Sequence, residues 1–289
     1  MMRGPVMSAL AVRDPHGDIE IDSWENPSIT AWYKKTPFVR GIFNLGSSLS
    51  IGYKCLMRSA SIAGHEEESS KFDQWLEKKL GKSRLAAIVQ ILSLVIAIVI
   101  AVGLFFVLPT ILVGFLSEFF ESNILRSVIE GVVRITILIL YMFAVSRLPD
   151  IRRVFAYHGA EHKTISCYES EEELTVENVR AKSRLHPRCG TSFLLIVVVI
   201  SILVFSFISW ENALMRVFLR IALLPVVVSI AYEIIKFTGR HDNAFTKVVA
   251  APGLWLQMIT TNEPDDDQIE VAIASMQPVI PQEKGIDEW

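Results

Sequence analysis

The chain has 289 residues, enough for more than one folding unit, and a formal net charge of −3 with no Lys/Arg stripe that would suggest a nucleic-acid partner. Hydrophobic residues make up 51% of it and the mean hydropathy is +0.40, which argues against a purely soluble protein. The three cysteines are odd in number and far apart in the sequence, which argues against a framework of disulfide bonds.

The first 33 residues predict a small β element. Residues 6–12 and 18–22 have a strand-like composition and flank the turn-rich quartet Asp14-Pro15-His16-Gly17, so we expect a β-hairpin. No signal peptide is recognisable, and the first 84 residues are polar enough to form a cytoplasmic segment.

Residues 38–64 are helical in character. Glycines interrupt this stretch, and it mixes apolar with small polar side chains, which suits an interfacial or packed helix better than a membrane span. Residues 65–84 are rich in charge and predict a linker in front of the first long apolar run.

Four later stretches are apolar enough to be membrane spans. Residues 85–117 contain no charged residue, and one helix needs only roughly 20 apolar residues to cross a bilayer. We expect Pro109 to end or kink the first span. In the segment 85–145 we expect the spans 85–108 and 123–145. In the segment 191–235 we expect the spans 191–209 and 213–235.

The distribution of charge predicts the orientation in the membrane. Basic residues gather before the first span, between the second and third, and after the fourth, whereas the short loop between the first two carries only acidic charges. By the positive-inside bias, both termini, the loop 146–190 and the C-terminal helices and tail, 236–289, are cytoplasmic. Arg216 and Arg220 fall near the outer end of the fourth span and would have to snorkel or find a partner.

Three charged residues lie inside the second span, Arg126, Glu130 and Arg134. Glu130 and Arg134 are four residues apart on one face of the expected helix, and charges in a span normally face the interior of a helix bundle. We favour a pair that holds helices together over a functional role, because we expect no other polar partner from the first or third span.

The pentad His158-Gly159-Ala160-Glu161-His162 follows the second span closely and concentrates side chains that bind metals. On a helix, its two imidazoles lie on one face with Glu161 beside the second. This H-x-x-E-H order is that of the inverted zinc metallopeptidases, in which two histidines hold Zn²⁺ and the glutamate polarises a water. Gly159 weakens such a helix, or allows a substrate or another backbone to approach closely.

Further candidate ligands follow the pentad. The H-x-x-C spacing of His186 and Cys189 is compatible with ligation of the same ion. Glu233, near the cytoplasmic end of the fourth span, is far enough along the chain to come from a separate helix. A catalytic zinc site usually keeps three protein ligands and one open position for water, so we expect the two pentad histidines plus one of these three residues.

The same region offers groups for catalysis. Glu161 is the candidate base, and Lys163 or Arg188 could stabilise an oxyanion. Each feature also has a less specific interpretation. Short H-x-x-E-H strings arise by chance, and the His, Lys and Arg side chains of 146–190 could bind lipid headgroups or a partner with no ion present. Glu233 could pair with Lys236 on its own helix.

Six strings in the chain resemble the YqhQ-like family of bacterial multi-pass membrane proteins, which are catalogued as predicted metal-dependent enzymes. These strings are MMRGP at 1–5, YHGAEHKTISCYE at 157–169, LTVENVR at 174–180, SRLHPRCGTSF at 183–193, AYE at 231–233 and LWLQMITTNEP at 254–264. The resemblance covers essentially the whole chain and implies location in the bacterial plasma membrane. It also implies a Gly-rich stretch of the form GGQAVMEGV ahead of MMRGP, and the candidate residues His158, Glu161, His162, His186, Cys189 and Glu233.

The sequence therefore predicts a mainly α membrane protein with about four transmembrane helices, a cytoplasmic helical module and a small N-terminal β element. The first functional hypothesis is a metal-dependent hydrolase at the cytoplasmic membrane face, with a divalent transition metal, Zn²⁺ first, as cofactor. The second is a non-enzymatic membrane factor that binds lipid or assists membrane-protein assembly, with a structural His/Glu/Cys cluster. The lipid bilayer is the expected partner, and the sequence identifies neither a protein partner nor a homo-oligomer.

Overall fold

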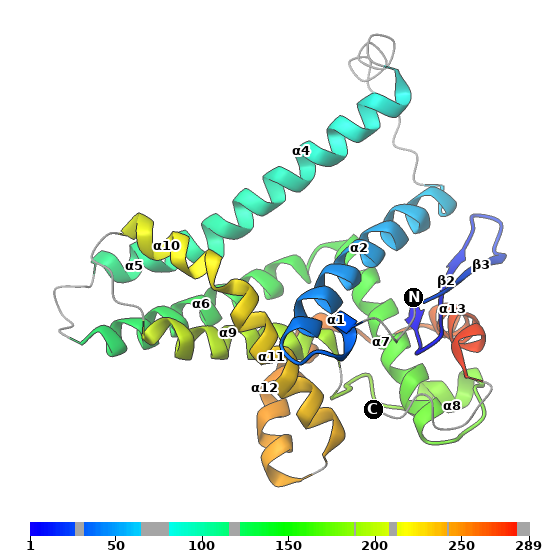
Figure 1. Ribbon diagram of the computed structural model, residues 1–289. Coiled ribbons are helices and arrows are strands. Elements are labelled where there is room, and N and C mark those ends of the chain that lie inside the picture. The colour runs from blue at the N-terminus through cyan, green and yellow to red at the C-terminus, as the bar shows by residue number, and fades with distance from the viewer. Residues whose placement is uncertain are drawn as a thin grey trace.

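A computed structural model describes residues 1–26, 32–64, 81–115, 122–187, 189–207, 213–241 and 243–281. The protein is mainly helical, with a three-stranded antiparallel sheet near the N-terminus (Figure 1). Most of the expected 65–84 linker and the candidate residue Arg188 lie outside the described residues.

The N-terminal sheet contains the predicted hairpin. Strand β2 (Met7–Arg13) pairs with β3 (Ile19–Glu25), and the short β1 (Met2–Arg3) adds a third strand on the other side of β2. The Asp14 carboxylate accepts hydrogen bonds from the backbone N–H groups of His16 and Asp18, which fixes the turn. β2 is the central strand, and most of its side chains are buried.

The predicted packed helix is α2 (Val39–Ile62), preceded by the short α1 (Trp32–Lys35). It contacts α11 (Leu224–Arg240) at Gly41, where a Cβ atom would lie 2.7 Å from Cβ of Tyr232. Farther along α2, Cys55 packs with Leu10 and Val12 of the sheet. α2 therefore joins the helix bundle to the N-terminal strands.

The first apolar run does not end at Pro109. α4 (Lys82–Val102) continues through a π-helical turn, η1 (Gly103–Val107), into α5 (Leu108–Phe115). A proline cannot donate to the carbonyl four residues earlier, which here belongs to Phe105. Nε of Arg134 donates to that oxygen at 2.9 Å. A side chain from another helix thus replaces the missing backbone donor, as apolar surroundings require.

Within the part of the chain that the structure describes, two helices are long and apolar enough to cross a membrane, Ile88–Phe115 and Ile124–Val145. The second belongs to α6 (Asn123–Val145). α10 (Ala213–Ala222) and α11 are bent by 44° at their junction and count as a third span only when they are taken together. The expected span at 191–209 corresponds to α9 (Gly190–Ser206), which is apolar but short. The described residues therefore contain two or three helices that suggest membrane association, and a count of four stays a prediction.

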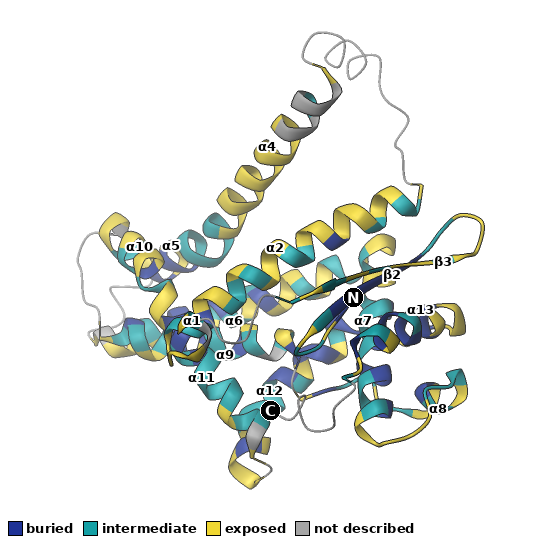
Figure 2. Cartoon of the chain, turned by 45° about the vertical axis from the view of Figure 1, so that its right-hand side comes forward, coloured by how far each residue is buried: buried dark blue, intermediate teal, exposed yellow. Residues whose placement is uncertain are grey.

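The surface of α4 supports membrane association. None of its most apolar 18-residue window is buried, and Figure 2 shows the helix exposed along its described length, projecting from the other helices. Isoleucine, leucine and valine side chains cover this surface. A continuous apolar patch of this extent is unfavourable in water and suits contact with lipid chains.

A buried charge cluster connects four helices of the bundle. Arg220 of α10 forms a two-pronged ion pair with Glu130 of α6. Arg134 lies 3.4 Å from the same carboxylate and donates to the hydroxyl of Ser201 of α9. The hydroxyl of Thr110 of α5 donates to the Glu130 carboxylate at 2.8 Å. The expected pairing of Glu130 with Arg134 is therefore present, and Arg220 has the partner it required. The expectation that no polar group would come from the first and third spans was wrong.

The remaining elements form a module beside the sheet. α7 (Pro149–Glu169) follows α6 directly and packs against α8 (Val176–Ala181) and α13 (Asp266–Met276). α13 is followed by the 3-10 turn η3 (Gln277–Val279) and contacts β2. A capping box at Asp265 starts α13, as its acidic N-terminus predicts. α12 (Ala244–Thr260) leads back from the bundle to this module.

Candidate metal centre

Three of the predicted ligands meet at the junction of the bundle and the module. His158 and His162 lie one turn apart on α7, and Cys189 is the N-cap residue of α9. One ligand atom from each of the three residues lies within 4.8 Å of the other two. The ring centroids of the two histidines are 4.4 Å apart, as the i, i+4 spacing on one helix face predicts.

Backbone carbonyls fix the protonation of both imidazoles. Nδ1 of His158 lies 2.9 Å from the carbonyl oxygen of Thr260, and Nδ1 of His162 lies 2.6 Å from that of Arg184. A carbonyl oxygen only accepts hydrogen bonds, so each Nδ1 must carry a proton. The lone pair of each neutral ring is then on Nε2, and Nε2 of His158 lies 3.2 Å from Sγ of Cys189. Metal-binding histidines are commonly held in this way, with the other ring nitrogen donating to a carbonyl.

Gly159 allows the first of these carbonyls to reach the site. A Cβ atom at Gly159 would lie 2.1 Å from the carbonyl oxygen of Asn262, so a side chain there would displace this segment. The N–H of Asn262 donates to the carbonyl of Phe155 at 2.9 Å, and its side-chain amide donates to that of Arg152 at 3.1 Å. The glycine thus serves the close approach of a backbone, one of the two roles that the sequence suggested.

The Cys189 thiol is held in its charged form. Burial alone would raise the pKa of this thiol, but the hydrogen bonds and charges of His158 and His162 outweigh burial and lower the pKa to about 5. Burial alone would lower the pKa of His158, but its hydrogen bonds to Cys189 and to the Thr260 carbonyl, together with the Cys189 and Glu161 charges, raise it to about 9. At neutral pH the pair is therefore a thiolate and an imidazolium, and a metal cation could take the place of the shared proton.

The donor set fits a divalent transition metal. Two imidazole nitrogens and one thiolate are a ligand combination known for zinc, and a set of three leaves one position for water. Thiolate and imidazole together favour Zn²⁺ over Mg²⁺ or Ca²⁺, which prefer oxygen ligands. Of the three alternatives for the third ligand, the structure brings Cys189 to the two histidines.

The other two alternatives for the third ligand lie elsewhere. Nε2 of His186 is 3.1 Å from a carboxylate oxygen of Glu169, and its ring centroid is 5.8 Å from that of His162. The Glu233 carboxylate forms an ion pair with Arg40 at the start of α2. Neither residue joins the metal-binding group among the described residues.

The candidate catalytic residues have different surroundings. The Glu161 carboxylate is half-buried, has no hydrogen bond to the side chains that the structure describes, and is close enough to raise the pKa of His158. The buried Lys163 donates to the carbonyl of Arg180 at 2.9 Å and pairs with Glu263. These contacts already use the Lys163 ammonium group, which was the candidate for stabilising an oxyanion, whereas Glu161 keeps its role as the candidate base.

Sequence reasoning did not single out Arg184, which helps to hold the site together. Arg184 supplies the carbonyl for His162, and its guanidinium donates to the carbonyl of Thr261. The buried Gln257 donates to the carbonyl of His186 and accepts from its N–H, both at 2.8 Å. The strings around 183–193 and 254–264 contain these residues, so the sequence indicated the segments but not the pairing between them.

Comparisons with known proteins cover the residues of this site but assign no chemistry to it. Residues 36–282 match the family model described as "Protein of unknown function (DUF1385)". The "Uncharacterized protein YqhQ" of Bacillus subtilis (strain 168) is 36% identical over 272 residues, which cover 92% of this chain and 84% of that protein. No solved structure matches the chain.

Proposed function

Because this chain belongs to the DUF1385 family of proteins of unknown function, we propose a function from the site itself: a membrane-associated, metal-dependent hydrolase with the ligands His158, His162 and Cys189. We place it in the bacterial plasma membrane with this site at the cytoplasmic face, following the distribution of basic residues. The observation that carries the proposal is the pair of Nδ1 hydrogen bonds, which leave both Nε2 atoms as the ligand positions beside a thiolate once a metal displaces the proton of His158.

The chemistry follows from the donors and their neighbours. A bound Zn²⁺ would lower the pKa of a coordinated water and so supply a nucleophile at neutral pH. Glu161, adjacent to His162 on α7, would accept the proton of that water on its carboxylate and return it to the leaving group. The carbonyls of Thr260 and Arg184 keep both rings in the ligating orientation throughout.

Metal content tests the first half of the proposal. The full chain, purified in detergent and analysed for metals, should hold about one equivalent of zinc or a similar ion. His162→Ala should lose it. His16→Ala, in the exposed turn of the hairpin, is the matched control and should retain it. Equal metal content in both variants would refute the site.

Hydrolysis tests the second half. Metal-loaded protein should cleave at least one member of a panel of fluorogenic peptides and lipid esters, and Glu161→Gln should reduce the rate by about 100-fold or more while retaining the metal. If the metal is bound and Glu161→Gln changes no rate, the hydrolase is excluded.

A second candidate is a non-enzymatic membrane factor with a structural ion at this site. The burial of His162 and Cys189, each less than a tenth exposed, favours it, because structural sites are normally closed to substrate. In that case metal removal would lower the melting temperature and no hydrolysis would be detected. Four protein ligands in the metal-bound protein, measured by X-ray absorption, would support the structural site over the catalytic one.

A further inference from the structure

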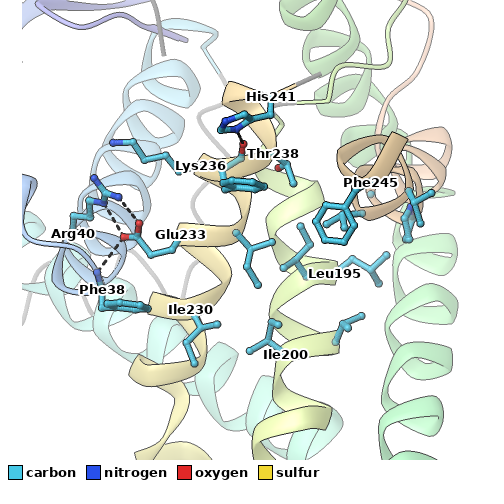
Figure 3. A pocket seen from close by; sticks show the side chains of 18 residues that line it. Phe38, Arg40, Leu195, Ile200, Ile230, Glu233, Lys236, Thr238, His241 and Phe245 are labelled. Atoms are coloured by element: carbon cyan, nitrogen blue, oxygen red, sulfur yellow. Dashed lines mark hydrogen bonds and ion pairs between the residues drawn. The ribbon is translucent and has the colours of Figure 1, made fainter. Parts of the chain in front are cut away.

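A groove of about 790 Å³ lies between α9, α11, α12 and the start of α2, away from the metal centre. This volume is within the range of about 300–1,000 Å³ of pockets that bind small molecules. None of the three candidate metal ligands lines it. Its walls are mainly aliphatic and aromatic side chains, which include Leu195 and Ile200 of α9, Ile230 of α11 and Phe245 of α12 (Figure 3).

The groove has a polar end. Figure 3 shows Arg40, Lys236 and His241 gathered toward one end, while Ile230 and Ile200 lie at the other. Arg40 forms an ion pair with Glu233. The Glu233 carboxylate also accepts a hydrogen bond from the N–H of Phe38 at 3.1 Å. Among the described residues that line this end, Arg40 and Lys236 outnumber the one carboxylate, that of Glu233, so this lining has an excess of positive charge.

The apolar part of the groove is open to its surroundings. Phe245 is 65% exposed and Val248 is 71% exposed, although both are apolar and both line the groove. In water such a surface would be unfavourable, whereas in a bilayer it would be in contact with acyl chains. The groove therefore combines a lipid-accessible apolar wall with a basic end.

We propose that this groove binds an anionic phospholipid, with an acyl chain along α9 and α11 and the phosphate at Arg40 and Lys236. Charge complementarity selects the headgroup, because the polar end carries net positive charge. The apolar walls select a chain-bearing ligand over free phosphate. This proposal does not depend on the hydrolase, because the groove and the metal centre share no residue.

Native mass spectrometry of the full, delipidated chain in detergent tests the proposal. Phosphatidylglycerol should bind about fivefold more tightly than phosphatidylcholine with the same acyl chains, which corresponds to about 1 kcal/mol for one basic side chain. Lys236→Gln should remove that preference. Lys247→Gln, an exposed lysine on α12 outside the groove, is the control and should keep it.

A second pair of variants tests the apolar part. Val199→Trp on α9 places a large ring in the groove and should weaken binding about tenfold, as expected from the loss of contact with about two methylene groups. Leu203→Trp, one turn farther on α9 and exposed outside the groove, should leave lipid binding unchanged. Equal effects of the two tryptophans, equal binding of the two lipids, or complete displacement by glycerol phosphate would each overturn the proposal.

Discussion

Gly159 and Asn262 are in such close contact that a Cβ atom on the glycine would lie 2.1 Å from the asparagine carbonyl oxygen. The segment that this contact places against α7 also carries the Thr260 carbonyl, which orients His158. The packing of one glycine thus determines the orientation of one predicted metal ligand.

Gly159→Ala should destabilise the protein and weaken metal binding. The added methyl group must displace a backbone carbonyl, and overpacking of this kind typically costs about 1–3 kcal/mol. Gly46→Ala on α2 is the matched control, because a Cβ atom there meets nothing within 4 Å and alanine favours a helix. Melting temperature and zinc affinity measure the two effects. If Gly159→Ala behaves like Gly46→Ala, the contact does not position the site.

Metal binding should release protons in a pH-dependent way. With a His158 pKa of about 9 and a Cys189 pKa of about 5, the metal-free pair holds one exchangeable proton at pH 7. We expect the pair to release about one proton per ion at pH 7, fewer as pH rises through 9 and more as pH falls through 5. Calorimetry in two buffers of different ionisation enthalpy measures this number. A value near zero at pH 7 would contradict the thiolate–imidazolium pair.

Glu130→Gln should strongly destabilise the helix bundle. It leaves the buried guanidinium of Arg220 without its carboxylate, and breaking a buried pair by removing one partner costs about 3–5 kcal/mol. Arg220→Gln should cost a similar amount, and the double variant should cost clearly less than the sum of the two. Unfolding in detergent measures this cycle. Strict additivity would mean that the pair contributes no coupling energy.

Glu233→Gln should leave the metal content unchanged. Its carboxylate is paired with Arg40, so its loss should loosen the contact between α2 and α11 rather than remove a ligand. Cys189→Ser should instead lower zinc affinity, because a hydroxyl replaces the thiolate. Metal analysis of the two variants side by side makes the comparison. Loss of metal in Glu233→Gln would restore Glu233 as a candidate ligand.

Local patterns predicted local structure well. Two segments of strand-like composition around a turn predicted the β2–β3 hairpin, and the i, i+4 spacing predicted that His158 and His162 share one face of α7. Each of these depends on interactions within a few residues, where sequence spacing directly determines geometry.

Pairings across long sequence distances could not be predicted in the same way. Cys189, His186 and Glu233 had equal standing as third ligands, and only the proximity of Cys189, at the start of α9, to the two histidines of α7 distinguishes it. The Phe105 carbonyl that Pro109 leaves without a donor was foreseeable, but its partner Arg134 was not, because it comes from another helix. Spacing identifies the groups that need partners, while the three-dimensional packing decides which partners they receive.

The guanidinium of Arg134 uses all three of its nitrogens, on the Phe105 carbonyl, the Ser201 hydroxyl and the Glu130 carboxylate. Moving it would break contacts to η1, α6 and α9 at once. The positive charge at this position is therefore held stationary within the bundle.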